Sequence, residues 1–241
     1  HGRLRALDLQ GKPIFDMLDY NDYHKVLVED VRSWSYMKFP FIKALGPENG
    51  WYRVGPLARM NTASFIDTPI ANAAHSVLRA FSDGLNHSTL ANHWARMIEV
   101  VHCVEKIREL LHDPDLQGTD LVAKGERRFE GIGVIEAPRG NLIHHYKVDE
   151  HEQVTYCNLI VSTTHNNEGM NRAVKDVKNV AVTYLSGQAK ITEGMLNHVE
   201  VAIRAYDPCL SCATHALGQM PLQVEVYGPE GQLLDRAGQC L

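Results

Sequence analysis

The chain has 241 residues, of which 44% are hydrophobic and 22% are charged. This composition is typical of a globular protein and excludes intrinsic disorder, collagen and coiled coil. The net charge is −5 and the basic residues are scattered, so the chain offers no positive surface for nucleic acid. No apolar run approaches the roughly 20 residues of a membrane span. The first residues do not resemble a signal peptide, so we expect a cytoplasmic protein without a membrane span.

The first half of the chain mixes strand and helix patterns. Alternation over residues 1–13, with a turn at Gln-Gly, predicts a short hairpin arm. Apolar residues over 23–43 recur without clean alternation, which indicates irregular helix and then loop. Pro69 followed by apolar residues at helical spacing predicts a helix that ends near residue 85. A longer apolar stripe predicts a helix over 88–111 with one buried face.

The second half begins with three β-rich runs that predict a small antiparallel sheet: 131–136, 141–148 and 154–161. Helical spacing returns over 171–185 and again from Thr192, an N-cap residue, to residue 205. Residues 223–227 and 232–235 flank a Gly-Pro-Glu-Gly turn, which predicts a terminal hairpin. No repeat or linker marks a second domain, so we expect one α+β unit with an appended tail.

Five cysteines are an odd number and do not form a disulfide framework. Cys103 lies in the long predicted helix and Cys157 in a predicted strand, and we expect both to be small core residues. Cys209 and Cys212 are spaced so that two thiolates can face one metal, and His215 follows three positions later. Soft thiolates select nickel, iron, copper or zinc over magnesium.

The cysteine pair alone is compatible with several kinds of site. A c-type haem needs a histidine directly after the second cysteine, where this chain has Ala213. A thioredoxin-like pair follows a strand, whereas Pro208 ends a predicted helix just before this pair. A structural zinc site, with Cys103 or Cys157 as the fourth ligand, remains open.

Longer motifs around the pair are more specific. Residues 136–144 read EAPRGNLIH, residues 162–164 read STT, and residues 207–215 read DPCLSCATH. In type and order these segments resemble motifs of the large subunit of [NiFe] hydrogenases. Across essentially the whole chain, the sequence is most similar to the cytoplasmic NAD-reducing, bidirectional group. The resemblance implies an α+β fold, with a mainly helical core and a small antiparallel sheet, that is incomplete without an N-terminal half carrying an R-x-C-G-x-C motif.

The resemblance also implies a nickel–iron centre whose iron carries carbon monoxide and cyanide. Cys209 corresponds to a terminal nickel ligand and proton acceptor, and Cys212 to the thiolate that bridges nickel and iron. His215 corresponds to a magnesium ligand. Arg139 is expected to act as fixed positive charge over the open metal position, because a guanidinium stays protonated at neutral pH. Residues expected around the centre are Asp207, Pro138, Leu142, Thr163 and His144.

The activity implied is reversible heterolytic oxidation of dihydrogen. Electrons would pass through iron–sulfur clusters of a small subunit to diaphorase subunits that hold FMN and NAD. This chain has no G-x-G-x-x-G motif and is not expected to bind NAD itself. Residues 1–215 would form the C-terminal half of the large subunit. Residues 216–241 would be an extension that a maturation endopeptidase removes once nickel-insertion proteins have acted, so the chain would be a precursor.

Two other classes of function remain as alternatives. Related subunits of respiratory complex I share the scaffold but lack the metal cysteines, so the chain would then be a degenerate scaffold without hydrogenase activity. A zinc-stabilised interaction domain would bind one zinc and carry no carbon monoxide or cyanide. The fragment alone is expected to be inactive and to hold no nickel. Arg59 and Asn61, which follow a Gly-Pro pair, are interpreted as turn or capping residues.

Overall fold

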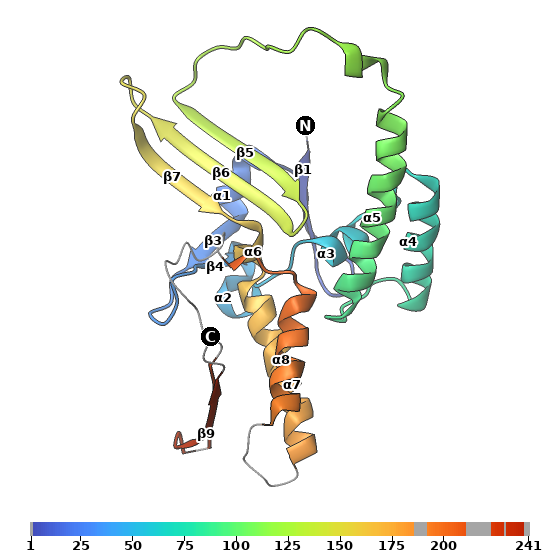
Figure 1. The fold of residues 1–241 in the computed structure, drawn as a ribbon. Helices are drawn as coiled ribbons and strands as arrows, with labels where there is room; N and C mark the ends of the chain where they lie inside the picture. The colour runs from blue at the N-terminus through green and yellow to red at the C-terminus, as the bar shows by residue number, and fades with distance from the viewer. Residues whose placement is uncertain (1, 186–191, 211–222, 229, 239–241) are drawn as a thin grey trace.

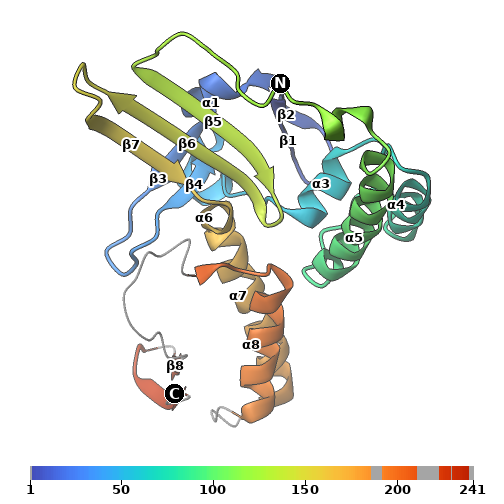
Figure 2. The same cartoon turned by 45° about the horizontal axis from the view of Figure 1, so that its top comes forward.

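The computed structural model describes residues 2–185, 192–210, 223–228 and 230–238. It has the predicted α+β architecture, in which helices lie beside several small antiparallel sheets (Figure 1). Helices α4 and α5 lie on one side of the molecule and the β5–β7 sheet on the other (Figure 2). Among the described residues, no helix combines the length and apolarity that crossing a membrane requires.

Two hairpins open the chain. Strands β1 (Arg3–Leu7) and β2 (Pro13–Asp19) pair antiparallel, which confirms the predicted arm. A 3-10 turn (Tyr20–Asp22) and the short helix α1 (Tyr23–Val26) follow. The expectation of helix and then loop over 23–43 is wrong beyond α1, because β3 (Leu27–Asp30) and β4 (Phe39–Ile42) form a second hairpin. Each of these strands has four residues, which is too short for a clear alternation.

A helical region comes next. Its elements are a 3-10 turn (Lys43–Leu45), α2 (Gly46–Asn49), α3 (Pro56–Thr62), α4 (Pro69–Phe81), α5 (Ala91–Leu110) and a 3-10 turn (Pro114–Gln117). Proline opens both α3 and α4, where its missing N–H costs no helical hydrogen bond. The predicted helix after Pro69 is confirmed, although it ends four residues earlier than expected. Leu57, Met60, Leu78 and Ile98 form the centre of this core.

The buried face of α5 is the predicted one only in part, because Ile98 of the expected apolar stripe is buried while other stripe residues are exposed. The side that packs in the core carries Ala91, Ala95 and Ile98. Met97 and Val104, which the pattern placed on the buried stripe, are each 61% exposed. Small residues let neighbouring helices approach closely, so the buried face follows the alanines rather than the large side chains. Cys103 is likewise exposed, so its interpretation as a core residue is wrong.

The predicted antiparallel sheet is confirmed. Its strands are β5 (Glu130–Ala137), β6 (Gly140–Val148) and β7 (Val154–Ile160), in the order β5-β6-β7. Ile143 and Ile160 are paired across the sheet, each 1% exposed, and pack with Tyr23. Cys157 pairs with Tyr146 on the opposite face and is exposed, which corrects the expectation that it is a core residue.

The C-terminal elements are α6 (Ser162–His165), α7 (Asn167–Leu185), α8 (Glu193–Ala205), β8 (Gln223–Tyr227) and β9 (Leu233–Gly238). The predicted N-cap is confirmed, because the Thr192 side chain accepts a hydrogen bond from Met195 N–H. Helices α7 and α8 pack through Met170, Ala173 and Ala202. The β8–β9 hairpin is also confirmed, and it lies apart from the rest of the fold in Figures 1 and 2.

Candidate functional site

Segments distant in sequence meet at the turn between β5 and β6. The Ser162 hydroxyl, at the start of α6, donates to the carbonyl of Gly140 at 2.9 Å. Asn166, just after α6, accepts from the backbone N–H of Val54 at 2.9 Å and donates to the carbonyl of Arg139. Figure 2 shows the β5–β6 turn beside α6. The EAPRG and STT motifs are therefore joined by hydrogen bonds, with the segment before α3 as a third member.

Two glycines allow this close approach. Gly55 has φ 97° and Gly140 has φ 131°, a region that other residues rarely adopt. A Cβ on Gly55 would lie 2.9 Å from the carbonyl oxygen of Arg139, and one on Gly140 would overlap the side chain of Val54. The backbones of the two segments thus cross without room for side chains. This crossing fixes the backbone position of Arg139.

Arg139 reaches the segment that follows α8. Its Nε donates to the carbonyl of Asp207 at 2.5 Å and lies 3.1 Å from the carboxylate Oδ2 of the same residue. Arg139 and Asp207, both expected around the centre, therefore form an ion pair. Asp207 adopts φ 51°, a left-handed conformation that short polar side chains tolerate, and Pro208 follows it. The chain consequently leaves α8 in a sharp turn and presents Cys209.

Thr163 fixes the position of Cys209. The threonine is 2% exposed, and its Oγ1 accepts a hydrogen bond from the Cys209 N–H at 3.0 Å. A hydroxyl that accepts one hydrogen bond keeps its own O–H to donate. Cys212 and His215, the other two predicted ligands, lie outside the described residues.

The remaining expected residues lie further along the hairpin. Pro138 is exposed in the turn itself. Leu142 is partly buried on β6, opposite Ile135 of β5. His144 lies on the same face of β6 as Leu142, and its Nδ1 is 3.4 Å from the hydroxyl of Tyr146. The structure thus brings Arg139, Asp207, Thr163 and Cys209 together, while His144 contacts a neighbour on its own strand.

Arg59 also contributes to the site, although no sequence motif indicates it. This α3 residue forms ion pairs with Glu99 of α5 and Glu136 of β5. It also donates to the carbonyls of Ala137 and Pro138, at 2.9 and 2.8 Å. Its interpretation as a turn or capping residue is therefore wrong. No spacing rule joins positions 59, 99 and 136, so the sequence carried no signal for this cluster.

A buried histidine lies behind the site. His165 and Tyr52 join through Nδ1 and the phenol oxygen at 2.6 Å. Burial lowers the pKa of His165 to about 4 and raises the pKa of Tyr52, so both groups are neutral at pH 7. The His165 Nε2 is buried and has no hydrogen-bond partner among the described residues. No sequence pattern predicts this pair, because neither residue belongs to a recognisable motif.

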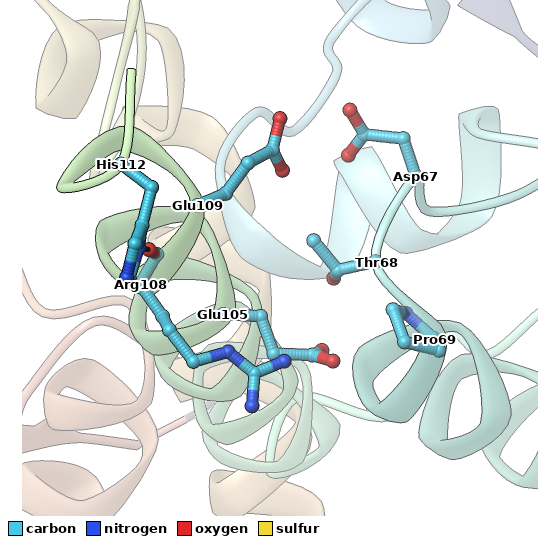
Figure 3. A pocket seen from close by; sticks show the side chains of 7 residues that line it. All are labelled: Asp67, Thr68, Pro69, Glu105, Arg108, Glu109 and His112. Atoms are coloured by element: carbon cyan, nitrogen blue, oxygen red, sulfur yellow. Dashed lines mark hydrogen bonds between the residues drawn. The ribbon is translucent and has the colours of Figure 1, made fainter. Parts of the chain in front are cut away.

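The described residues line two hollows. The larger, of about 840 Å³, lies among the β1–β2 arm, residues 51–55 and α3, and it reaches Glu136 and His165. The smaller, of about 380 Å³, lies between α4 and α5 and is lined by Asp67, Thr68, Pro69, Glu105, Arg108, Glu109 and His112 (Figure 3). The Glu105 carboxylate accepts the backbone N–H groups of Ile70 and Ala71. Glu105 therefore has a structural role as the cap of α4.

The donor groups indicate which metal centre the site suits. Within the described ranges, no three His, Cys, Asp or Glu side chains cluster closely enough to hold a metal ion. The site does place one cysteine beside a cationic guanidinium and a buried hydroxyl, Arg139 and Thr163. These groups fit a soft thiolate centre with anionic outer ligands, because cyanide requires hydrogen-bond donors. They do not fit a hard cation, which would need oxygen ligands.

The motifs, the fold and the family comparison agree. Residues 11–215 match the family model of the nickel-dependent hydrogenases. This chain belongs to that family.

Among curated relatives, the chain is 53% identical to the NAD-reducing hydrogenase HoxS subunit beta of Cupriavidus necator, over 98% of the chain and 48% of that protein. It is 40% identical to an iron-sulfur subunit of the F420-non-reducing hydrogenase from Archaeoglobus profundus, over 95% of the chain and 48% of that protein. The chain thus spans about half the length of these relatives.

Solved structures give the same result for the fold. The crystal structure of an NAD+-reducing [NiFe]-hydrogenase in the H2-reduced state matches with a TM-score of 0.83 and 54% identity, over 89% of this chain and 47% of that one. A [NiFeSe] hydrogenase variant from Desulfovibrio vulgaris Hildenborough matches with a TM-score of 0.58 and 21% identity, over 88% of this chain and 48% of that one. The second likeness concerns the fold alone.

Proposed function

We propose that this chain is the C-terminal half of the catalytic, large subunit of a [NiFe] hydrogenase of the NAD-reducing type. The activity would be reversible oxidation of dihydrogen to protons and electrons. One observation carries the proposal: Cys209 of the DPCxxC motif is hydrogen-bonded to the STT motif, next to the Arg139–Asp207 pair. The likeness to an NAD-reducing hydrogenase subunit supports the type.

Cys209 and Cys212 would hold the nickel, and Cys212 would also bridge to iron. The other thiolates would come from the half of the subunit outside this chain, so the fragment alone would be inactive. His215 would be a ligand of magnesium. When bound, the nickel–iron centre would supply the redox chemistry that converts dihydrogen into two protons and two electrons.

The described residues would orient this centre and protect it. Cys209 Sγ would accept the proton, because metal binding makes a thiolate available at neutral pH. Arg139 cannot serve as a base, since its guanidinium stays protonated, and it would contribute fixed positive charge. Asp207 holds that charge in place. The Thr163 hydroxyl and the Arg139 guanidinium would donate to cyanide on iron, and Pro138 would pack against the iron ligands. Leu142 would exclude water, and His144 would support the outer face.

Further proposals concern partners and processing. Electrons would leave through a small subunit with iron–sulfur clusters and reach NAD through FMN-bearing diaphorase subunits in the cytoplasm. Residues 216–241 would be removed by a maturation endopeptidase after nickel insertion. The β8–β9 hairpin supports this, since it lies apart from the body of the fold (Figure 1). Mass spectrometry of the active enzyme is expected to show a large subunit that ends at His215. An active enzyme that still carries residues 216–241 would contradict the proposal.

The proposed function is tested on the full-length large subunit in its complex. Wild type is expected to contain nickel and to show infrared bands of carbon monoxide and cyanide. Cys209→Ser should lose nickel and activity, because it removes a soft ligand. Cys103→Ser, at an exposed cysteine of α5, is the matched control and should keep both. Stoichiometric zinc without infrared bands in wild type would favour the zinc-stabilised alternative.

A further inference from the structure

The guanidinium of Arg59 lies at the centre of a saturated hydrogen-bond cluster. An arginine has five N–H donors in a planar fork. Nε and Nη2 donate to the two carboxylate oxygens of Glu99, at 2.5 and 2.8 Å. Nη1 donates to Glu136 at 2.5 Å and to the carbonyl of Ala137, and Nη2 donates to the carbonyl of Pro138. Five donors thus meet five acceptors, and two of the acceptors are backbone carbonyls of the EAPRG turn.

The cluster is anchored on the helical core. Glu99 belongs to α5 and Arg59 to α3, and each side chain is only 22% exposed. Their bidentate pair fixes the plane of the guanidinium, so its remaining N–H groups are directed at the turn. Glu136 extends the cluster, because its second carboxylate oxygen accepts from the side chain of Asn141 at 2.8 Å. Residues on both sides of the turn, in β5 and β6, are therefore held by one carboxylate.

The turn is held by hydrogen bonds from two elements, α3 and α6. Arg59 holds Ala137 and Pro138, the two residues before Arg139. From the opposite direction, α6 holds Gly140, the residue after Arg139, since Ser162 donates to the Gly140 carbonyl. Arg139 lies between these two sets of hydrogen bonds, and its side chain points at Asp207.

We propose that Arg59 is a positioning residue, which holds the EAPRG turn so that the guanidinium of Arg139 meets Asp207 beside Cys209. The consequence for catalysis rests on the proposed function. The geometric role does not, because it concerns how firmly the turn is held in this chain.

Charge and shape together explain why this residue is an arginine. Glu99 and Glu136 bring two negative charges to the cluster, and Arg59 lies between them. A neutral substitute leaves two carboxylates facing each other without a cation, which is unfavourable in a partly buried site. A lysine keeps the charge but is a point donor with no planar fork. It cannot hold Glu99 in a bidentate pair and reach both carbonyls.

The test compares Arg59→Gln and Arg59→Lys in the full-length subunit and its complex. The first readout is hydrogen–deuterium exchange of the segment 136–142, which needs no metal centre. We expect Arg59→Gln to accelerate exchange there by about tenfold, since loss of a charged hydrogen-bond cluster corresponds to at least this change in local opening. Arg59→Lys should give a smaller increase, while exchange near residues 146–156 stays unchanged in both.

The second readout is the position of the cyanide infrared bands in the assembled enzyme. A displaced Arg139 changes hydrogen bonding to the cyanides, so Arg59→Gln should shift or broaden these bands, and Arg59→Lys should restore them only in part. The matched control is Arg5→Gln, which removes another bidentate arginine–carboxylate pair, with Asp16 in the N-terminal arm. It should leave exchange at 136–142 and the bands unchanged.

Each outcome decides the matter. Faster exchange at 136–142 together with altered bands supports the proposal. Unchanged exchange in Arg59→Gln overturns it. Faster exchange with unaltered bands also overturns it, because Arg59 would then be merely structural. If Arg59→Gln does not fold, Glu99→Gln weakens the same anchor and is judged by the same two readouts. Absence of the bands in wild type would instead contradict the proposed function, and the exchange experiment would remain valid.

Discussion

The hydroxyl of Thr163 and the backbone N–H of Cys209 are joined by a 3.0 Å hydrogen bond across 46 positions of sequence. The threonine is buried in the short helix α6, which is itself tied to the β5–β6 turn through Ser162. The backbone position of the cysteine is therefore fixed by the most buried part of the site as well as by α8. This makes Thr163 a sensitive point for the arrangement of the whole site.

Replacing Thr163 by valine should test this hydrogen bond. Valine has the same shape but no hydroxyl, so the Cys209 N–H loses its acceptor. We expect a loss of about 1–2 kcal/mol in the free energy of unfolding. Urea denaturation of the purified full-length subunit measures it, and Thr163→Ser, which keeps the hydroxyl, should recover most of the loss. Equal stabilities of the valine and serine variants would contradict the expectation.

The glycine crossing predicts strong effects of a single methyl group. Gly55→Ala and Gly140→Ala combine a positive φ with contact against Arg139 and Val54, respectively. Strain of this kind costs about 1–3 kcal/mol before any overlap is counted. Gly46→Ala has a positive φ of 71° but nothing within 4 Å of the new Cβ, so it reports the conformational cost alone. In thermal unfolding, the melting temperature of Gly46→Ala should be well above those of the other two variants. Equal losses of stability in all three variants would show that the crossing is not tight.

Stability should fall in mild acid because of His165. Its pKa is about 4 in the folded protein, compared with 6.5 for an unperturbed histidine. Between these values the unfolded chain binds a proton that the folded chain refuses, so stability is full above pH 6.5 and declines towards pH 4. Between these two pKa values, the contribution of His165 to the free energy of unfolding falls by up to about 1.4 kcal/mol for each pH unit.

Chemical denaturation at a series of pH values measures this decline. His165→Gln cannot take up the proton, so its stability should fall less steeply over the same range. His151→Gln, at the exposed turn between β6 and β7, is the control and should keep the slope of wild type. Parallel curves for wild type and His165→Gln would rule out His165 as the source.

The pocket of Figure 3 yields a prediction about helix capping. Glu105 accepts the N–H groups of Ile70 and Ala71, and these hydrogen bonds help to lower its pKa against the opposing effect of burial. Glu105→Gln removes the charge that faces the positive end of α4 and should lower the melting temperature. Glu109→Gln, on the same pocket wall but more exposed, should have little effect. Calorimetry on the full-length subunit distinguishes the two, and equal shifts would contradict a capping role for Glu105.

Local patterns in the sequence predicted most of the elements. The three-stranded sheet, the helix after Pro69, the Thr192 cap and the terminal hairpin all depend on interactions within one element or between neighbours in sequence. The β3–β4 hairpin was missed because four-residue strands carry too little pattern. The buried face of α5 was predicted only in part, because the contact surface also depends on which residues are small, and that depends on the partner helices.

The site shows a similar division. Motifs identified Arg139, Thr163, Asp207 and Cys209, and the structure places these residues together. Arg59 and His165 were not found, because their importance arises from long-range contacts with Glu99, Glu136 and Tyr52. A periodic pattern can show that a residue lies on a helix or strand. It cannot show which distant carboxylate that residue will meet.

The contact between Arg139 and Asp207 spans 68 positions, and Cys209 comes later still. During synthesis on the ribosome, the sheet, α3 and α5 are complete long before the cysteine emerges. The Arg59 cluster and the glycine crossing use only residues made by that time, so the cradle for the cysteine can form first. The nascent chain would then add its thiolate to a preformed receptor. A metal that needs that thiolate would accordingly be loaded after this cradle has formed and not before it.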